Sequence, residues 1–339
     1  MPNSAPNVAR PSPQPSPGGR GGQFLRQYVP QLATLIVWLL LFAFASLSYD
    51  NFFTLRNFIN FFHNNAFLGV AAVGMTYVIL SGGIDLSVGA MMAFTSILLA
   101  RLVGIAEIHP LAAMLVVIAI GTGYGAVMGL AIHALKLPAF LITLAGMFFV
   151  RGMGFVVEEQ QRRIDHPFYE ELAGYRLPVT EKAGMPVVAL TMFAAFAVGA
   201  AVLRWTRFGR NIYAIGGSEP SALLMGVPVG RTKIAVYAIS GMCAALAGVV
   251  YSVDTGAGDP AAGVGLELDV IACVVIGGTL LTGGSGNLFG TLLGVLIFAT
   301  IKAGIAFDGR LNSWWIRIAI GALLLGFILM QKWIGRERR

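Results

Sequence analysis

Charged residues are scarce in this chain: Asp, Glu, Lys and Arg make up only 12% of its 339 residues, whereas 57% are hydrophobic. Soluble domains carry about 25% charged residues, so this composition excludes an ordinary globular protein. Most apolar stretches have the roughly 20-residue length with which a helix crosses about 30 Å of hydrocarbon, and they are too long for barrel strands. The composition therefore predicts an all-α, polytopic membrane protein.

Residue types that carry catalysis or bind metals are equally sparse. The two cysteines, Cys243 and Cys273, lie in separate apolar segments without metal-ligand spacing, so we expect small buried side chains and no disulfide. The four histidines show no paired ligand spacing, and no nucleophile, base and metal ligands cluster, which argues against an intramembrane enzyme. The sequence also has no Gly-x-x-x-x-Gly-Lys-Ser/Thr phosphate loop. We therefore expect a protein that is not an enzyme, has no cofactor or metal of its own and does not hydrolyse ATP itself.

The apolar segments divide the chain into a short tail and a membrane domain. Residues 1–23 contain six prolines and no apolar run, which predicts a disordered cytoplasmic tail ahead of a transmembrane domain over 24–339. About ten spans are predicted, near residues 30–47, 66–81, 84–100, 110–133, 138–157, 185–203, 234–253, 268–281, 290–306 and 314–331.

Lysine and arginine set the predicted orientation. They are more frequent in the segments that lie inside when the amino terminus is cytoplasmic, so both termini are expected to be cytoplasmic, as ten spans require. The formal net charge of +7 then reflects topology in a lipid membrane and predicts no nucleic-acid partner.

Two of the predicted spans, the second and the eighth, are short and end in glycine pairs. These pairs are Gly82-Gly83 and Gly283-Gly284, and a further glycine, Gly89 or Gly290, follows six residues after each pair. Short, glycine-interrupted segments in corresponding halves indicate the central pathway of a transporter. Close packing of small residues between helices explains the same pattern, and the sequence does not separate the two interpretations.

The first interruption also contains an acid and a hydroxyl, Asp85 and Ser87. Burying an ionisable residue in the membrane costs a few kcal/mol, so such a residue usually faces a protein interior or a watery cavity. We interpret Gly82, Gly83, Asp85, Ser87 and Gly89 as part of a translocation pathway. The alternative is that Asp85 only caps the following helix.

Two further acids, Glu267 and Asp269, lie next to the short eighth span on the predicted outer side. We assign them to the same pathway in a structural or gating role. Three basic residues lie within or at the edge of spans, and we expect their long side chains to reach the membrane interface; they are Arg151, Lys302 and Arg317.

The long cytoplasmic segment 204–233 predicts a short helix lying under the membrane. Pro220 suits a first helical turn, Ser218 or Glu219 suits the cap, and Gly226 suits the stop. Ala222, Leu223 and Met225 would form an apolar face that fits a groove on a soluble partner. The alternative is that this face rests on lipid.

The sequence resembles the ribose-type permeases, the permease family of bacterial ABC importers for monosaccharides, over nearly its whole length after the tail. The resemblance lies in residues 74–89, 138–144, 213–217 and 267–279. Within that family, residues 145–152 and 307–315 are most similar to the permease of the galactofuranose importer.

The resemblance implies the fold of ribose-type permeases and a subunit that carries a monosaccharide, galactofuranose in the finer match, across the bacterial inner membrane by alternating access. It implies three partners: an ABC ATPase that holds ATP and Mg²⁺, a periplasmic sugar-binding protein, and a second permease subunit, either a related chain or a second copy. The loop before the seventh span would contain the coupling helix, with the contact residues Gly216, Gly217, Glu219, Ala222, Leu223, Met225 and Gly226. The alternative is a proton-coupled secondary sugar transporter that works without an ATPase and uses Asp85 or Glu267 as proton carrier.

Overall fold

The computed structural model describes residues 20–180, 183–310, 312 and 314–336. Residues 1–19 of the predicted tail lie outside the described residues. The predicted tail extended to residue 23 because residues 1–23 are rich in proline. Helix α1 begins at Arg20, so residues 20–23 are helical.

The described part of the chain is helical apart from four short strands. The helices are α1 (Arg20–Ser48), α2 (Leu55–Asn64), α3 (Ala66–Leu80), α4 (Val88–Gly104), α5 (Pro110–Leu135), α6 (Ala139–Val157), α7 (Pro167–Gly174), α8 (Val187–Trp205), α9 (Arg207–Gly217), α10 (Glu219–Leu224), α11 (Val229–Thr255), α12 (Leu266–Ile276), α13 (Leu288–Asp308) and α14 (Trp314–Arg336). The strands are β1 (Arg162–Arg163), β2 (Arg176–Thr180), β3 (Ala183–Pro186) and β4 (Ala257–Gly258), with β1 antiparallel to β4 and β2 antiparallel to β3.

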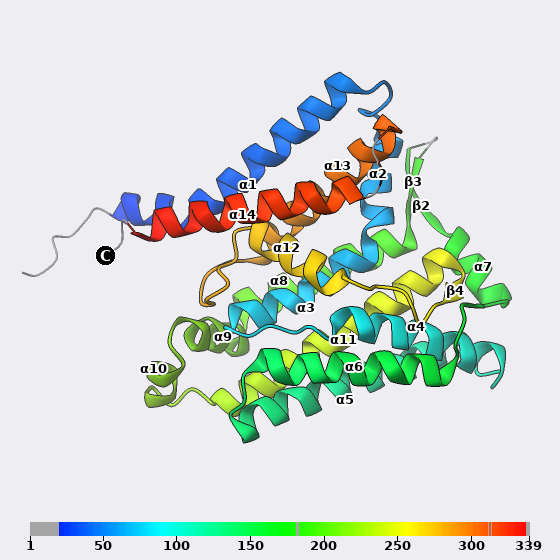
Figure 1. Cartoon of the computed structure of the whole chain (residues 1–339), viewed down its shortest axis with the longest axis horizontal. Coiled ribbons are helices and arrows are strands. Elements are labelled where there is room, and N and C mark those ends of the chain that lie inside the picture. Colours follow the sequence, from blue (N-terminus) through cyan, green and yellow to red (C-terminus); the bar gives the residue numbers. More distant parts are fainter. Residues whose placement is uncertain (1–19, 181–182, 311, 313, 337–339) are drawn as a thin grey trace, which may run out of the picture.

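The core is built around α3 and α11. Every residue of α3 except Phe67 is buried, as expected of a helix that is apolar on all sides. Helix α11 packs against α3, α4 and α5, while α12 packs against α3 and α13. Helices α5 and α6 lie on one side of this core and α1 and α14 on the other (Figure 1).

The two ends of the bundle differ. Helices α9 and α10 lie at one end, where α1 begins and α14 ends, and the β2–β3 hairpin and α7 lie at the opposite end (Figure 1). On α7, Tyr169 is buried and its hydroxyl lies 3.3 Å from the Ser252 hydroxyl of α11. Burial raises the pKa of Tyr169 to about 12, and the contact of its protonated phenol with Ser252 holds α7 against the bundle.

The prediction of an α-helical, polytopic membrane protein is confirmed. Among the described residues, six helices are long and apolar enough to cross a membrane, and the bent pair α2–α3 makes a seventh candidate. Two shorter apolar helices, α4 and α14, and the 11-residue α12 account for the other predicted spans. Each of the ten predicted spans thus coincides with one helix.

Several boundaries were wrong because local sequence does not reveal where a helix is interrupted. Helix α4 begins at Val88 and not at residue 84, and α12 ends at Ile276 and not at residue 281. Helix α2 was not predicted because its many polar residues hide it; it starts at the cap Thr54 and meets α3 at Asn65 with a bend of 55°.

The cysteines agree with expectation: Cys243 and Cys273 are buried and free. Among the described residues, no group of three or more His, Cys, Asp or Glu side chains is arranged to hold a metal ion.

Candidate functional site

The break between α3 and α4 buries the carboxylate of Asp85. Its Oδ1 accepts hydrogen bonds from the Ser87 amide at 2.9 Å and from the Ser87 hydroxyl at 2.7 Å. Its Oδ2 accepts one from the Ser240 hydroxyl of α11 at 2.7 Å. Asp85 and Ser87 are each only 3% exposed. The carboxylate therefore ties the start of α4 to α11.

This geometry bears on both interpretations of Asp85. Ser87 occupies the N-cap position of α4 but makes no side-chain cap of its own, and the Asp85 carboxylate binds its amide instead. This bond satisfies the amide of the N-cap residue itself, and the interpretation of Asp85 as a helix cap stays a prediction beside the pathway interpretation. The link to Ser240 goes beyond a local cap, because it joins the break to a helix 155 residues away in sequence.

Two tyrosine hydroxyls near Asp85 were missed by the sequence analysis. Within the described residues, the hydroxyls of Tyr124 on α5 and Tyr237 on α11 are buried and have no partner in good hydrogen-bond geometry, although Tyr124 lies beside Ser87 and Tyr237 beside the Ile84 backbone. Both hydroxyls lie close to the Asp85 carboxylate. In sequence they look like ordinary members of apolar spans, so only the fold identifies this polar cluster.

A second contact brings together two residues predicted for the pathway, Gly89 and Glu267. A Cβ atom added to Gly89 would lie 2.5 Å from Oε2 of Glu267, so the Glu267 side chain of α12 packs directly against the backbone of α4. That carboxylate oxygen is buried and has no hydrogen-bond partner among the described residues. Asp269, two residues further on, interacts electrostatically with Glu267 and with the basic side chains of Arg317 and Lys302.

Arg151 binds the loop that precedes α12, and the expectation that its side chain reaches the membrane interface stays a prediction. Its Nη1 donates a hydrogen bond to the Pro260 carbonyl at 3.0 Å and another to the Ala262 carbonyl. The guanidinium also interacts electrostatically with Glu267. Arg151 thus holds the loop that precedes α12 close to α6.

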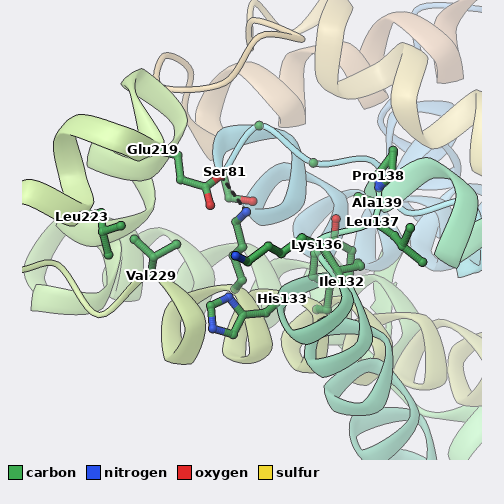
Figure 2. A pocket seen from close by; sticks show the side chains of 14 residues that line it. Ser81, Ile132, His133, Lys136, Leu137, Pro138, Ala139, Glu219, Leu223 and Val229 are labelled. Atoms are coloured by element: carbon green, nitrogen blue, oxygen red, sulfur yellow. Dashed lines mark hydrogen bonds and ion pairs between the residues drawn. The ribbon is translucent and has the colours of Figure 1, made fainter.

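Gly82 and Gly83, at the other end of the break, line a cavity of about 500 Å³. Figure 2 shows His133 and Lys136 from the end of α5 on one side of this cavity and Glu219 of α10 on the other. The ion pair between Glu219 Oε2 and Lys233 Nζ, at 2.7 Å, connects α10 to α11 at the cavity edge. Tyr237 lines the same cavity.

Segment 204–233 folds as two short helices, α9 and α10. Ser218 caps α10 by accepting a hydrogen bond from the Ser221 amide, and Pro220 lies in the first turn, as predicted. Gly226 follows α10 with φ +79°, and hydrogen bonds from Gly226 to Leu223 and from Val227 to Ala222 close the helix in a Schellman motif. The stop at Gly226 was therefore predicted correctly.

The apolar face of α10 differs from the predicted one. Ala222 is fully buried and belongs to a small cluster with Ile215 and Val229, so it faces the protein. The exposed apolar side chains are Leu223 at 64%, Leu224 at 89% and Met225 at 71%. Leu224 was missed because a six-residue helix is too short to show from sequence which side faces inward.

The other residues that the sequence predicted for contact with the ATPase do not lie on the exposed apolar face of α10. Gly216 and Gly217 end α9 next to the helix breaks, and Glu219 is paired with Lys233. Gly226 is exposed at the helix stop.

Comparison with known proteins gives consistent results. A family model described as branched-chain amino acid transport system / permease component matches residues 57–328. The inner membrane ABC transporter permease protein YjfF of Escherichia coli K12 is 47% identical over 308 residues, covering 91% of this chain and 93% of that protein.

Two relatives are named for sugar import. The ribose import permease protein RbsC of Escherichia coli K12 is 36% identical, with 91% of this chain and 96% of that protein covered. The fructose import permease protein FruG of Bifidobacterium longum is 34% identical, with 92% and 93% covered. No solved structure matches the chain.

Proposed function

Because the chain belongs to the family of branched-chain amino acid transport system permease components, we propose that it is the permease subunit of an ATP-binding-cassette importer for a monosaccharide. Relatives named for ribose and fructose import, similar along nearly their whole length, support a sugar as substrate. The subunit would lie in the bacterial inner membrane with both termini cytoplasmic. The start of α1 and the end of α14 at the same end of the bundle support that arrangement (Figure 1).

The observation that carries this proposal is the exposed triplet of Leu223, Leu224 and Met225 on α10. Three neighbouring large apolar side chains are costly to expose to water on a surface helix. We therefore infer that a partner covers this surface. We propose that α10 is the coupling helix and inserts these side chains into a groove of the ATPase. ATP and Mg²⁺ would bind to that partner.

The pathway is proposed to follow the break between α3 and α4. The cavity at Gly82 and Gly83, the polar cluster at Asp85 and Ser87, and the contact between Gly89 and Glu267 succeed one another along this segment. Asp269 would act with Glu267 at the outer end. Because Asp85 is fully hydrogen-bonded and buried, its proposed role is to shape the path and not to read the sugar.

Transport would proceed by alternating access. A periplasmic sugar-binding protein would deliver the substrate, and closure of the ATPases would move α10 and rock the helices around the path. The resemblance of residues 145–152 and 307–315 to the galactofuranose permease supports galactofuranose as the sugar and a related second permease as the partner.

The test is uptake of labelled galactofuranose and ribose into vesicles that contain this chain. The vesicles are prepared with and without the three proposed partners, which are the ATPase, the binding protein and the second permease. We expect ATP-dependent uptake of galactofuranose only when all components are present. An ionophore that collapses the proton gradient should leave this uptake unchanged.

Two outcomes would contradict the proposal in different ways. Uptake by this chain alone that stops when the proton gradient collapses would identify a proton-coupled symporter. ATP-dependent uptake of ribose but not of galactofuranose would keep the importer and change the sugar.

A further inference from the structure

Three glycine pairs that are far apart in sequence meet at one place. Gly82-Gly83 follows α3, Gly216-Gly217 ends α9, and Gly283-Gly284 lies between α12 and α13. The Gly284 amide donates a hydrogen bond to the Leu80 carbonyl at 2.9 Å, which joins the two helix breaks. We call these three pairs the glycine junction.

The junction is in backbone contact without any side chain in between. A Cβ atom on Gly216 would overlap both the Leu80 carbonyl oxygen and the Gly284 amide nitrogen. A Cβ atom on Gly284 would lie 2.7 Å from the Gly217 nitrogen. Backbone atoms have no rotamers with which to absorb a displacement, so a shift of α9 must move both breaks or open the contact.

Helix α9 is directly continuous with the proposed coupling helix. Ser218 is both the C-cap of α9 and the N-cap of α10, so no flexible linker separates the two. A second tie strengthens the contact: the Tyr213 hydroxyl of α9 donates a hydrogen bond to the Gly286 carbonyl at 2.9 Å.

We propose that the glycine junction transmits displacement of α10 to both helix breaks at once, with Gly216 as its central positioning residue. This inference rests on the proposed function, in which an ATPase moves α10. One break ends beside Asp85 and the other leads into α13, so a single movement at the cytoplasmic end reaches both discontinuous segments of the core.

The chain offers a matched pair of variants. Gly216→Ala places a methyl group inside the junction, whereas Gly123→Ala, in α5 and outside the junction, meets no atom within 4 Å. Neither glycine has a positive φ, so alanine is compatible with the backbone at both positions. Of the two variants, only Gly216→Ala forces the junction open.

The readout is sugar uptake per ATP hydrolysed by the complete complex in vesicles. We expect Gly216→Ala to retain the ATPase in a pull-down but to lose about tenfold in uptake per ATP, the scale of coupling changes along a contact network. Gly123→Ala should behave like the wild type. Wild-type coupling in Gly216→Ala, or an equal loss in both variants, would overturn the inference.

A measurement on the wild-type complex decides the matter if Gly216→Ala does not fold. Hydrogen exchange is followed with and without vanadate, which traps ABC ATPases in the closed state. We expect protection of residues 78–87, 213–220 and 280–287 to change together. A change at 213–220 alone would overturn the junction and leave the importer intact, whereas failure of the wild-type chain to bind the ATPase would overturn both proposals.

Discussion

Asp85→Ala removes a carboxylate that accepts three hydrogen bonds at the break between α3 and α4. A hydrogen bond to a charged group contributes about 1.5–3 kcal/mol, but three bonds to one carboxylate are not additive. The Ser87 amide would also be left buried without an acceptor, whereas the Ser240 hydroxyl can turn to a carbonyl of its own helix. We expect a loss of about 4 kcal/mol of stability.

The assay combines thermal unfolding of the detergent-solubilised complex with uptake measured per folded complex. Asp85→Asn keeps the shape and one acceptor oxygen, so it should lose about half as much stability as Asp85→Ala. Asp165→Ala is the control because the Asp165 side chain is 80% exposed, and such surface substitutions change stability by less than about 0.5 kcal/mol.

The two assays separate the roles proposed for Asp85. A pathway role requires lower uptake per folded complex in Asp85→Ala, and a purely structural role requires normal uptake per folded complex with lower stability. An Asp85→Ala variant with the stability and uptake of the wild type would refute the energetic reasoning and both roles.

Two further predictions follow from exposure and close contact. Leu224→Ser should weaken binding of the ATPase about tenfold or more in a pull-down titration, because burying a leucine contributes about 1.5–3 kcal/mol. The control is Leu177→Ser, since Leu177 is 45% exposed on β2 at the opposite end of the bundle and its replacement should not weaken binding. Equal effects of the two variants would contradict docking on α10. Gly89→Ala should lower the melting temperature because its Cβ would overlap the Gly263 carbonyl and the Glu267 carboxylate. Gly104→Ala in the same helix should not lower it, because a Cβ atom there meets nothing within 4 Å. Equal melting temperatures of the two variants would contradict the close contact.

The positions and order of the apolar helices could be predicted from the sequence because they depend on a local property, the length of each apolar run. The helix breaks were also found, since Gly82-Gly83 and Gly283-Gly284 interrupt apolar runs. The extent of each break could not be predicted. Residues 84–87 look like the start of a span, and only the bonds that Asp85 makes with Ser87 and Ser240 show why they stay outside the helix.

The sequence predicted which polar residues of the helix break belong to the candidate site, but it did not predict the residues from other helices that surround them. Asp85 and Ser87 stand out because they are polar within an apolar region, but Ser240, Tyr124 and Tyr237 come from other helices and carry no local signal. On α10, the inward direction of Ala222 depends on its contact with Ile215 and Val229. Such contacts follow from tertiary packing, which a single sequence does not specify.

The two helix breaks share a glycine spacing but differ in charge, and this difference indicates unequal roles. The Thr76 and Thr291 hydroxyls, 2.9 Å apart, link α3 to α13, so the two segments pack as partners. The second break caps α13 with a neutral side chain, because Asn287 Oδ1 accepts a hydrogen bond from the Gly290 amide at 2.8 Å. The first break uses a buried carboxylate for the corresponding task, at a much higher desolvation cost. Since an asparagine is sufficient to start a helix at such a break, the carboxylate of Asp85 indicates a further task, and its bond to Ser240 joins the first break to α11.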